Sequence, residues 1–134
     1  MDVKIGMSAS YKKSFGDKEV AIFADISADN NPIHLDEEYA AQSIFRKRVV
    51  HGVLVASMFS KIFGTILPGE GGIYLSLSLK FMKPVYIDQV ITATVTLLEF
   101  DTNRNRGLFK TVCTNDLDEL VLVGEAQILF PDAA

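Results

Sequence analysis

The sequence of 134 residues has no tryptophan, one cysteine and two histidines. The single cysteine, Cys113, cannot form a disulfide within the chain, which fits a reducing compartment. The N-terminal residues show no apolar core followed by a small-residue cleavage site, so no signal peptide is expected and we predict a cytoplasmic protein. Because histidine and cysteine side chains are so few, a transition-metal site is not expected either. We therefore predict no metal and no other cofactor.

The sequence also has no excess of basic residues. Thirteen Lys and Arg stand against seventeen Asp and Glu, a formal net charge of −4, whereas sequence-independent binding of nucleic acid needs a concentrated basic face. The one basic run, Arg46–Arg48, is either a solvated loop or a phosphate contact. The uncharged stretch from Val49 to Ser60 is interrupted by Lys61, and a membrane span needs about 20 apolar residues. Neither nucleic acid nor a membrane is expected as a partner.

Hydrophobic residues, by contrast, make up 49% of the sequence, enough for a single domain over residues 1–134 to bury a sizeable core. Residues 17–27 have an apolar helical face, and Asp36 is a suitable N-cap for a second, short helix. Residues 52–67 are apolar nearly all round and end at Pro68-Gly69. We expect this third helix to be buried on every side.

The back half of the sequence alternates with a period of two, which is typical of strands. Strands are predicted over residues 73–82, 88–100, 108–114 and 119–130, with residues 7–13 as a candidate fifth. The first of these is expected to bury one face, made of Ile73, Leu75, Leu77, Leu79 and Phe81. Turn residues between the strands predict an antiparallel meander, wrapped around the apolar helix in an α+β fold. An open sheet edge would be covered by a second copy, so we also predict a homodimer.

The polar run from Asp29 to His34 is the best candidate for chemistry. On a helix the two side chains would point about 140° apart, but Pro32 disfavours helical backbone at Asn31, and a bent loop can bring the carboxylate and the imidazole together. Spacing alone favours a structural interpretation, in which Asp29 ends a helix and His34 bonds to backbone. The pair is a catalytic candidate only if the loop brings the two groups face to face.

The motif Asp29-x-Asn31-Pro32-Ile33-His34, followed by Ala40, resembles the signature of the MaoC-like (R)-specific enoyl-CoA hydratases, the hydratase 2 group. The run Val50–Leu54 with Ser57 and Ser60 resembles the central helix of that family, and Gly72–Pro84 resembles its next strand. The similarity covers nearly the whole chain, at the size of the short members that resemble the bacterial hydratases feeding polyhydroxyalkanoate synthesis. One departure is Ala28, where the family commonly has Gly; because alanine tolerates positive φ poorly, the loop is expected to differ slightly there.

The resemblance implies a hot-dog fold, in which an antiparallel sheet wraps a central helix, working as a homodimer. It implies reversible syn addition of water to a trans-2-enoyl-CoA, giving an (R)-3-hydroxyacyl-CoA within fatty-acid metabolism. Asp29 and His34 would hold the water and handle both protons, in an order that the sequence leaves open. The backbone N–H of Gly52 would donate to the thioester oxygen. His51 is interpreted as structural.

Three further residues have supporting roles in this hypothesis. Asn31 either orients the loop and His34 or is only a turn residue before proline. Ser60 would lie near the catalytic pair, bonded to Asp29 or to its own helix. Phe63 would cap the acyl pocket, which predicts a preference for short substrates such as crotonyl-CoA.

Other activities remain open at this point. A hot-dog acyl-CoA thioesterase would share the fold but has no need of the Asp-x-Asn-Pro-x-His loop. A 3-hydroxyacyl-carrier-protein dehydratase would need a basic docking patch, which the acidic balance supports only weakly. A non-enzymatic dimer that binds acyl-CoA would bind its ligand without turnover.

Overall fold

A computed structural model describes residues 2–132, in which four helices and five strands follow one another along the chain. The elements are β1 (Ser8–Ser14), α1 (Asp17–Ser27), α2 (Pro32–Leu35), α3 (Glu37–Ala41), α4 (Gly52–Thr65), β2 (Ile73–Phe81), β3 (Val90–Asp101), β4 (Arg106–Thr114) and β5 (Leu120–Leu129). The predicted helices and all five predicted strands are present, with ends that differ by two residues at most. One element, the single turn α2, was not predicted and carries His34.

The five strands form one antiparallel sheet in the order β1-β3-β4-β5-β2. Only β3, β4 and β5 form the predicted meander, so the prediction was wrong for β2, which pairs with β5 at the far edge. The chain between β2 and β3 is too long for a tight turn, and within it Tyr86 pairs with Val49 just before α4. The two open edges of the sheet are therefore β1 and β2.

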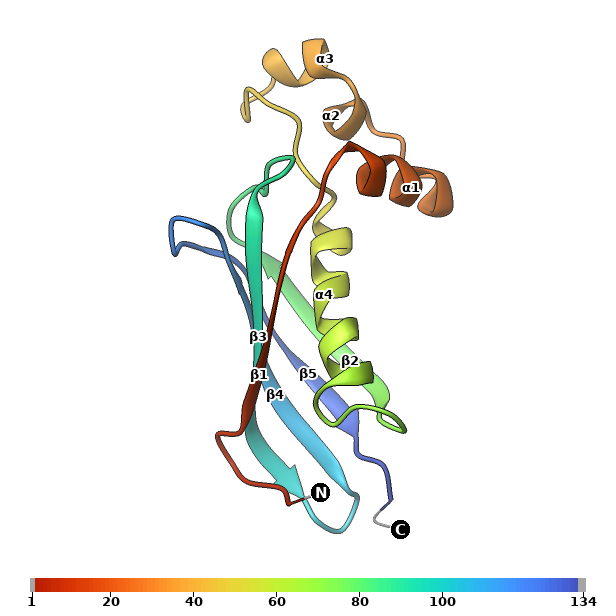
Figure 1. The fold of residues 1–134 in the computed structure, drawn as a ribbon, viewed down its shortest axis with the longest axis vertical. Coiled ribbons are helices and arrows are strands. Elements are labelled where there is room, and N and C mark those ends of the chain that lie inside the picture. Colours follow the sequence, from red (N-terminus) through yellow and green to blue (C-terminus); the bar gives the residue numbers. More distant parts are fainter. Residues whose placement is uncertain (1, 133–134) are drawn as a thin grey trace.

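Helix α4 lies across the concave face of this sheet (Figure 1). One side of the helix is fully buried: Phe59 and Ile62 are 0% exposed and belong to the same hydrophobic core as Val95 of β3, also 0% exposed. The opposite side is open, and Val53 is 61% exposed. The expectation of burial on every side was therefore wrong for the single chain, because one sheet covers only one side of a helix.

Strand β2 also departs from the prediction. Its alternating residues were expected to bury one face, yet Ile73 is 54% and Leu75 is 40% exposed. A bulge between Tyr74 and Ser76 shifts the alternation, so that Tyr74 faces α4, with its ring 5.3 Å from that of Phe63. Ile73 thereby leaves the inner face. Because β2 is an edge strand that pairs only with β5, its apolar residues remain exposed.

Helices α1, α2 and α3 cluster at one end of the sheet, beyond the N-terminus of α4 (Figure 1). This places the loop that follows α1 beside the first residues of α4. Within residues 2–132, none of the helices has both the length and the apolar character needed to cross a membrane.

Candidate active site

The loop between α1 and α2 is built from short polar side chains that bind nearby backbone N–H groups. Ser27 Oγ accepts from the Asp29 N–H at 3.0 Å, and Asp29 Oδ1 accepts from the Asn31 N–H at 3.3 Å. Asn31 Oδ1 then accepts from the Ile33 N–H at 3.2 Å and caps α2, whose first residue is Pro32. Each bond turns the chain within two residues, so the loop is bent as the sequence predicted.

Ala28, at the end of α1, takes a left-handed backbone with φ of 62°. Glycine adopts this conformation freely, whereas an alanine there is strained by roughly 1 kcal/mol. Alanine therefore takes a positive φ here, and the side-chain bonds of Ser27 and Asp29 on either side of it hold the loop in its bent form.

His34 is half-buried on α2, and its Nδ1 lies 2.7 Å from the carbonyl oxygen of Val49. A carbonyl only accepts, so Nδ1 carries the proton and Nε2 of the neutral ring is an acceptor. Burial lowers the pKa of His34 below its ordinary value of 6.5, against the opposing effect of the Val49 bond. The imidazole is therefore held neutral and able to accept a proton near neutral pH.

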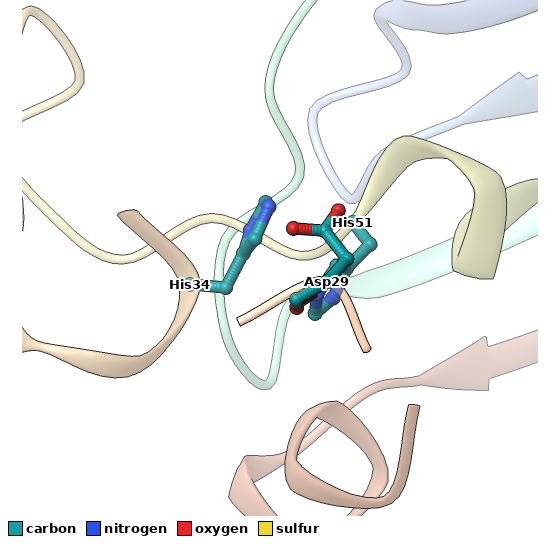
Figure 2. Close-up of side chains that lie close together, drawn as sticks. All are labelled: Asp29, His34 and His51. Atoms are coloured by element: carbon teal, nitrogen blue, oxygen red, sulfur yellow. Dashed lines mark hydrogen bonds between the residues drawn. The ribbon is translucent and has the colours of Figure 1, made fainter. Parts of the chain in front are cut away.

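Asp29 and His51 complete a three-residue cluster with His34 (Figure 2). The Asp29 carboxylate is exposed and points toward the His34 ring (Figure 2). His51 is 2% exposed, and its ring stacks on that of His34 with centroids 3.7 Å apart and planes 25° apart. Its Nε2–H donates to the backbone carbonyl of Asp29 at 3.0 Å. The loop thus brings the carboxylate and the two imidazoles together.

The cluster does not fit a metal that uses both imidazoles. The three side chains each offer one ligand atom, all within 4.8 Å of one another, but a bound ion lies about 2.0–2.1 Å from a ring nitrogen, close to the plane of that ring. Two stacked rings separated by 3.7 Å have no common in-plane point at that distance. The geometry suits proton handling around a water molecule instead.

Arg48 fixes the position of His34 from the other side. Its side chain is 12% exposed, its Nε donates to the His34 carbonyl at 2.7 Å, and its guanidinium pairs with Asp17 at the start of α1. Arg48 therefore links α1 to α2 and has a structural role.

A cavity of about 490 Å³ opens beside His34 and the first residue of α4, Gly52. Its walls are mostly apolar and include Asn31, Phe45, Val53, Val55, Phe81 and Leu122. The first intrahelical bond of α4 is donated by Val55 to the His51 carbonyl, so the N–H of Gly52 has no acceptor within its helix. The Phe81 ring lies over Gly52, where an added Cβ would sit 2.5 Å from it.

The remaining predicted residues lie elsewhere. Ser60 is exposed on the open side of α4, and the structure gives its hydroxyl no hydrogen bond to any described residue. Phe63 is 3% exposed and packs edge-on against Tyr74 and Phe109. The structure therefore gathers Asp29, His34, Asn31 and Gly52 but not these two. Sequence reasoning missed the contact between His51 and the pair; the presence of only two histidines in the chain was the available signal.

Comparison with known proteins identifies relatives of this chain. The model of the MaoC like domain matches residues 3–119. The chain is 41% identical over 130 residues to an (R)-specific enoyl-CoA hydratase from Rhodospirillum rubrum, covering 97% of this chain and 90% of that protein. It is 38% identical over 130 residues to a 3-hydroxybutyryl-CoA dehydratase from Methylorubrum extorquens, covering 97% of this chain and 82% of that protein.

Among solved structures, the chain resembles the (R)-hydratase from Aeromonas caviae involved in PHA biosynthesis. The TM-score is 0.94 at 39% sequence identity, and the match covers 96% of this chain and 98% of that one. This likeness confirms the predicted hot-dog arrangement of helix and sheet. The family model and the relatives together show that the chain belongs to the MaoC-like domain family.

Proposed function

We propose that this protein is an (R)-specific enoyl-CoA hydratase acting on short trans-2-enoyl-CoA thioesters such as crotonyl-CoA. The observation that carries the proposal is the Asp29 carboxylate facing the neutral imidazole of His34, which itself lines an apolar cavity together with Gly52. Relatives named as (R)-specific hydratase and as 3-hydroxybutyryl-CoA dehydratase support both the reaction and a four-carbon substrate. The 134 residues would form one such catalytic domain.

The chemistry follows from the hydrogen-bonding roles of the pair. Asp29 and His34 each offer one atom within 4.8 Å of the other, which leaves room for one water molecule to bridge the two side chains with two hydrogen bonds. Both the carboxylate and Nε2 accept, so the water is held with its hydrogens toward the pair and a lone pair toward substrate. As the water oxygen bonds to C3, one of its protons passes to the pair, and the pair returns a proton to C2. Addition from one side gives the syn product.

Negative charge develops on the thioester oxygen during this attack. The Gly52 N–H, at the positive end of α4, is the donor placed to stabilise it. Asn31 contributes indirectly, because its cap on α2 fixes the turn that carries His34. These groups supply the acid–base and electrostatic parts of the reaction without a cofactor.

We keep Phe63 as the residue that limits the length of the acyl chain. Phe63 fills the space between α4 and the sheet, where its ring meets those of Tyr74 and Phe109. It lies eleven residues after Gly52, about 16 Å along the helix. An acyl group that enters beside Gly52 and runs along α4 would meet this aromatic cluster at that depth, so the support for a four-carbon substrate comes from the relative named 3-hydroxybutyryl-CoA dehydratase.

A homodimer formed through β2 is part of the proposal. The other edge, β1, carries Lys12 and Lys13, a pattern that protects an edge from pairing. Strand β2 instead exposes Ile73 and Leu75. A second copy on this edge would also cover the open side of α4, where Ser60 lies, so a supporting role for Ser60 depends on that copy.

The decisive experiment follows the loss of enoyl absorbance from crotonyl-CoA and couples the product to an (R)- or (S)-specific dehydrogenase. We expect an (R) product from the wild type, and a loss of about 10²–10⁴-fold in kcat for Asp29→Asn and for His34→Gln. Asp25→Asn, an exposed acid on α1, is the matched control and should keep full activity. An (S) product, or full activity of both site variants, would refute the proposal. Thiol release without hydration would indicate a thioesterase, and far higher activity on a crotonyl carrier protein would indicate a carrier-protein dehydratase.

A further inference from the structure

His51 touches both members of the catalytic pair, although the proposed reaction gives it no role. It directly precedes α4 and is 2% exposed. Its ring stacks on His34 at 3.7 Å, and its Nε2–H bonds to the Asp29 carbonyl at 3.0 Å. On another side, the ring of Phe23 from α1 meets it edge-on at 4.8 Å. The side chain therefore contacts Asp29 through its backbone and His34 through its ring.

The second nitrogen of His51 makes the residue unsuited to a purely structural task. With the proton on Nε2, Nδ1 carries a lone pair and can only accept a hydrogen bond. This buried atom has no hydrogen-bond partner among the described residues. Burying such an atom is unfavourable, and a phenylalanine would fill the same space without it. The imidazole retains one thing that phenylalanine lacks, the N–H that binds the Asp29 carbonyl.

That bond matters because the other side-chain bonds of the turn are local. The Ser27, Asp29 and Asn31 side chains bind N–H groups only two residues away. They bend the turn but do not fix its position relative to α4. The His51 bond joins the turn to the start of α4, where Gly52 lies.

We propose that His51 is a positioning residue for the hydration reaction, an inference that rests on the proposed function. Its Nε2–H holds the Asp29 carbonyl and its ring supports the His34 imidazole, so that the carboxylate and Nε2 of His34 keep the spacing of one bridging water. Displacement of a reacting group by about 1 Å can cost 10²-fold in rate. The role of His51 is to prevent that displacement.

The ring of His51 also shields His34 from water, and burial is the largest cause of the lowered pKa of His34. The other charged groups around His34 are Asp29, which faces the ring, Arg48 with its partners Asp17 and Glu37, and Lys83 across the cavity. These charges stay in place when His51 is replaced, whereas the charge effect of His51 itself, which also lowers the pKa of His34, is lost in both His51 variants alike. A change in His34 titration between His51 variants therefore reports the loss of the stacked ring.

Two substitutions separate the bond from the ring. His51→Phe keeps an aromatic face and removes the donor, and we expect kcat to fall at least about tenfold with KM little changed. His51→Gln keeps an N–H near the position of Nε2 and removes the ring. It should recover much of kcat, while the acid limb of its pH profile moves to higher pH because water reaches His34. Phe23→Leu, which loosens packing on the same ring but keeps the bond, should leave kcat near that of the wild type.

Proton NMR tests the geometry without any substrate. Each His51 variant, prepared without a histidine tag, leaves His34 as the only histidine in the chain, so its resonance needs no assignment. The His34 pKa should be higher in His51→Gln than in His51→Phe. Equal pKa values in the two variants, wild-type kcat in His51→Phe, or an equal loss in Phe23→Leu would overturn the inference. If the wild type fails to hydrate crotonyl-CoA while the pKa difference is present, the proposed function fails and the positioning contact remains.

Discussion

Replacement of Gly52 by alanine tests the proposed oxyanion donor directly. A Cβ at this position would lie 2.5, 2.8 and 3.0 Å from three carbons of the Phe81 ring, whereas ordinary contact begins at 3.4 Å. The ring must therefore retreat by about 1 Å to a normal van der Waals separation. Phe81 ends the edge strand β2 and is 54% exposed, so it can move at little cost in folding free energy.

The expected loss is in catalysis. The new methyl group lies at the N–H on which the thioester oxygen would dock, and loss of one oxyanion donor costs about 10²–10³-fold in kcat, or about 2.7–4 kcal/mol. Stability should change by less than about 1 kcal/mol, because alanine favours the helix while the ring is displaced. The assay is crotonyl-CoA hydration together with thermal unfolding of the same preparation.

Two further variants make the result interpretable. Gly64→Ala adds a methyl group to the same helix where nothing lies within 4 Å, and should gain about 0.5–1 kcal/mol in stability with unchanged activity. Gly52→Ala combined with Phe81→Ala relieves the clash but leaves the N–H blocked, and should remain inactive. Full activity in Gly52→Ala would refute the oxyanion assignment. Recovery in the double variant would show that displacement of Phe81 caused the loss.

Three other predictions follow from the structure. Because burial lowers the pKa of His34 below 6.5, this residue takes up a proton below pH 6.5 in the unfolded chain but not in the folded chain. The contribution of His34 to the free energy of unfolding should therefore be greatest above pH 6.5 and should decrease as the pH drops through the folded-state pKa. Urea unfolding at several pH values measures this, and an unchanged slope in His34→Gln would contradict it. Phe63→Ala should raise kcat/KM for decenoyl-CoA relative to crotonyl-CoA in the hydration assay, and an unchanged ratio would remove Phe63 from the acyl pocket. Leu75→Asp on β2 should give a monomer by light scattering whereas Lys12→Asp on β1 stays dimeric; a dimer in both would place the interface elsewhere.

Local patterns predicted most of the elements. The period-two runs identified β2 and β3, the turn residues marked β4 and β5, and the candidate fifth strand is present as β1. Asp36 marked the start of α3 through the bond from the Tyr39 N–H to its side chain. The pairing partner of β2 was not predictable, because its choice of β5 depends on a contact between segments more than forty residues apart. A single bulge at Leu75 then shifted the alternation that had suggested a buried face.

The site was predictable to the extent that its geometry is local. The motif correctly indicated that Asp29 and His34 come together, because the bonds that bend the loop lie within it. The state of His34 depends on partners distant in the sequence, the Val49 carbonyl and the stacked ring of His51. No spacing rule predicts that a carbonyl fifteen residues away selects the Nδ1–H tautomer. The tautomer of His34, and the proton transfer that depends on it, can therefore be assigned only from the folded structure.

The same bonds decide which substitution at Asp29 is informative. The carboxylate serves the proposed reaction with its charge and serves the loop with Oδ1, which accepts from the Asn31 N–H. Alanine would remove both functions and release the turn, so a loss of activity would not distinguish chemistry from folding. Asparagine keeps an oxygen acceptor for the Asn31 N–H and removes only the negative charge and its basicity. An inactive Asp29→Asn with unaltered thermal unfolding therefore assigns the loss to proton transfer, because the turn that carries the residue is intact.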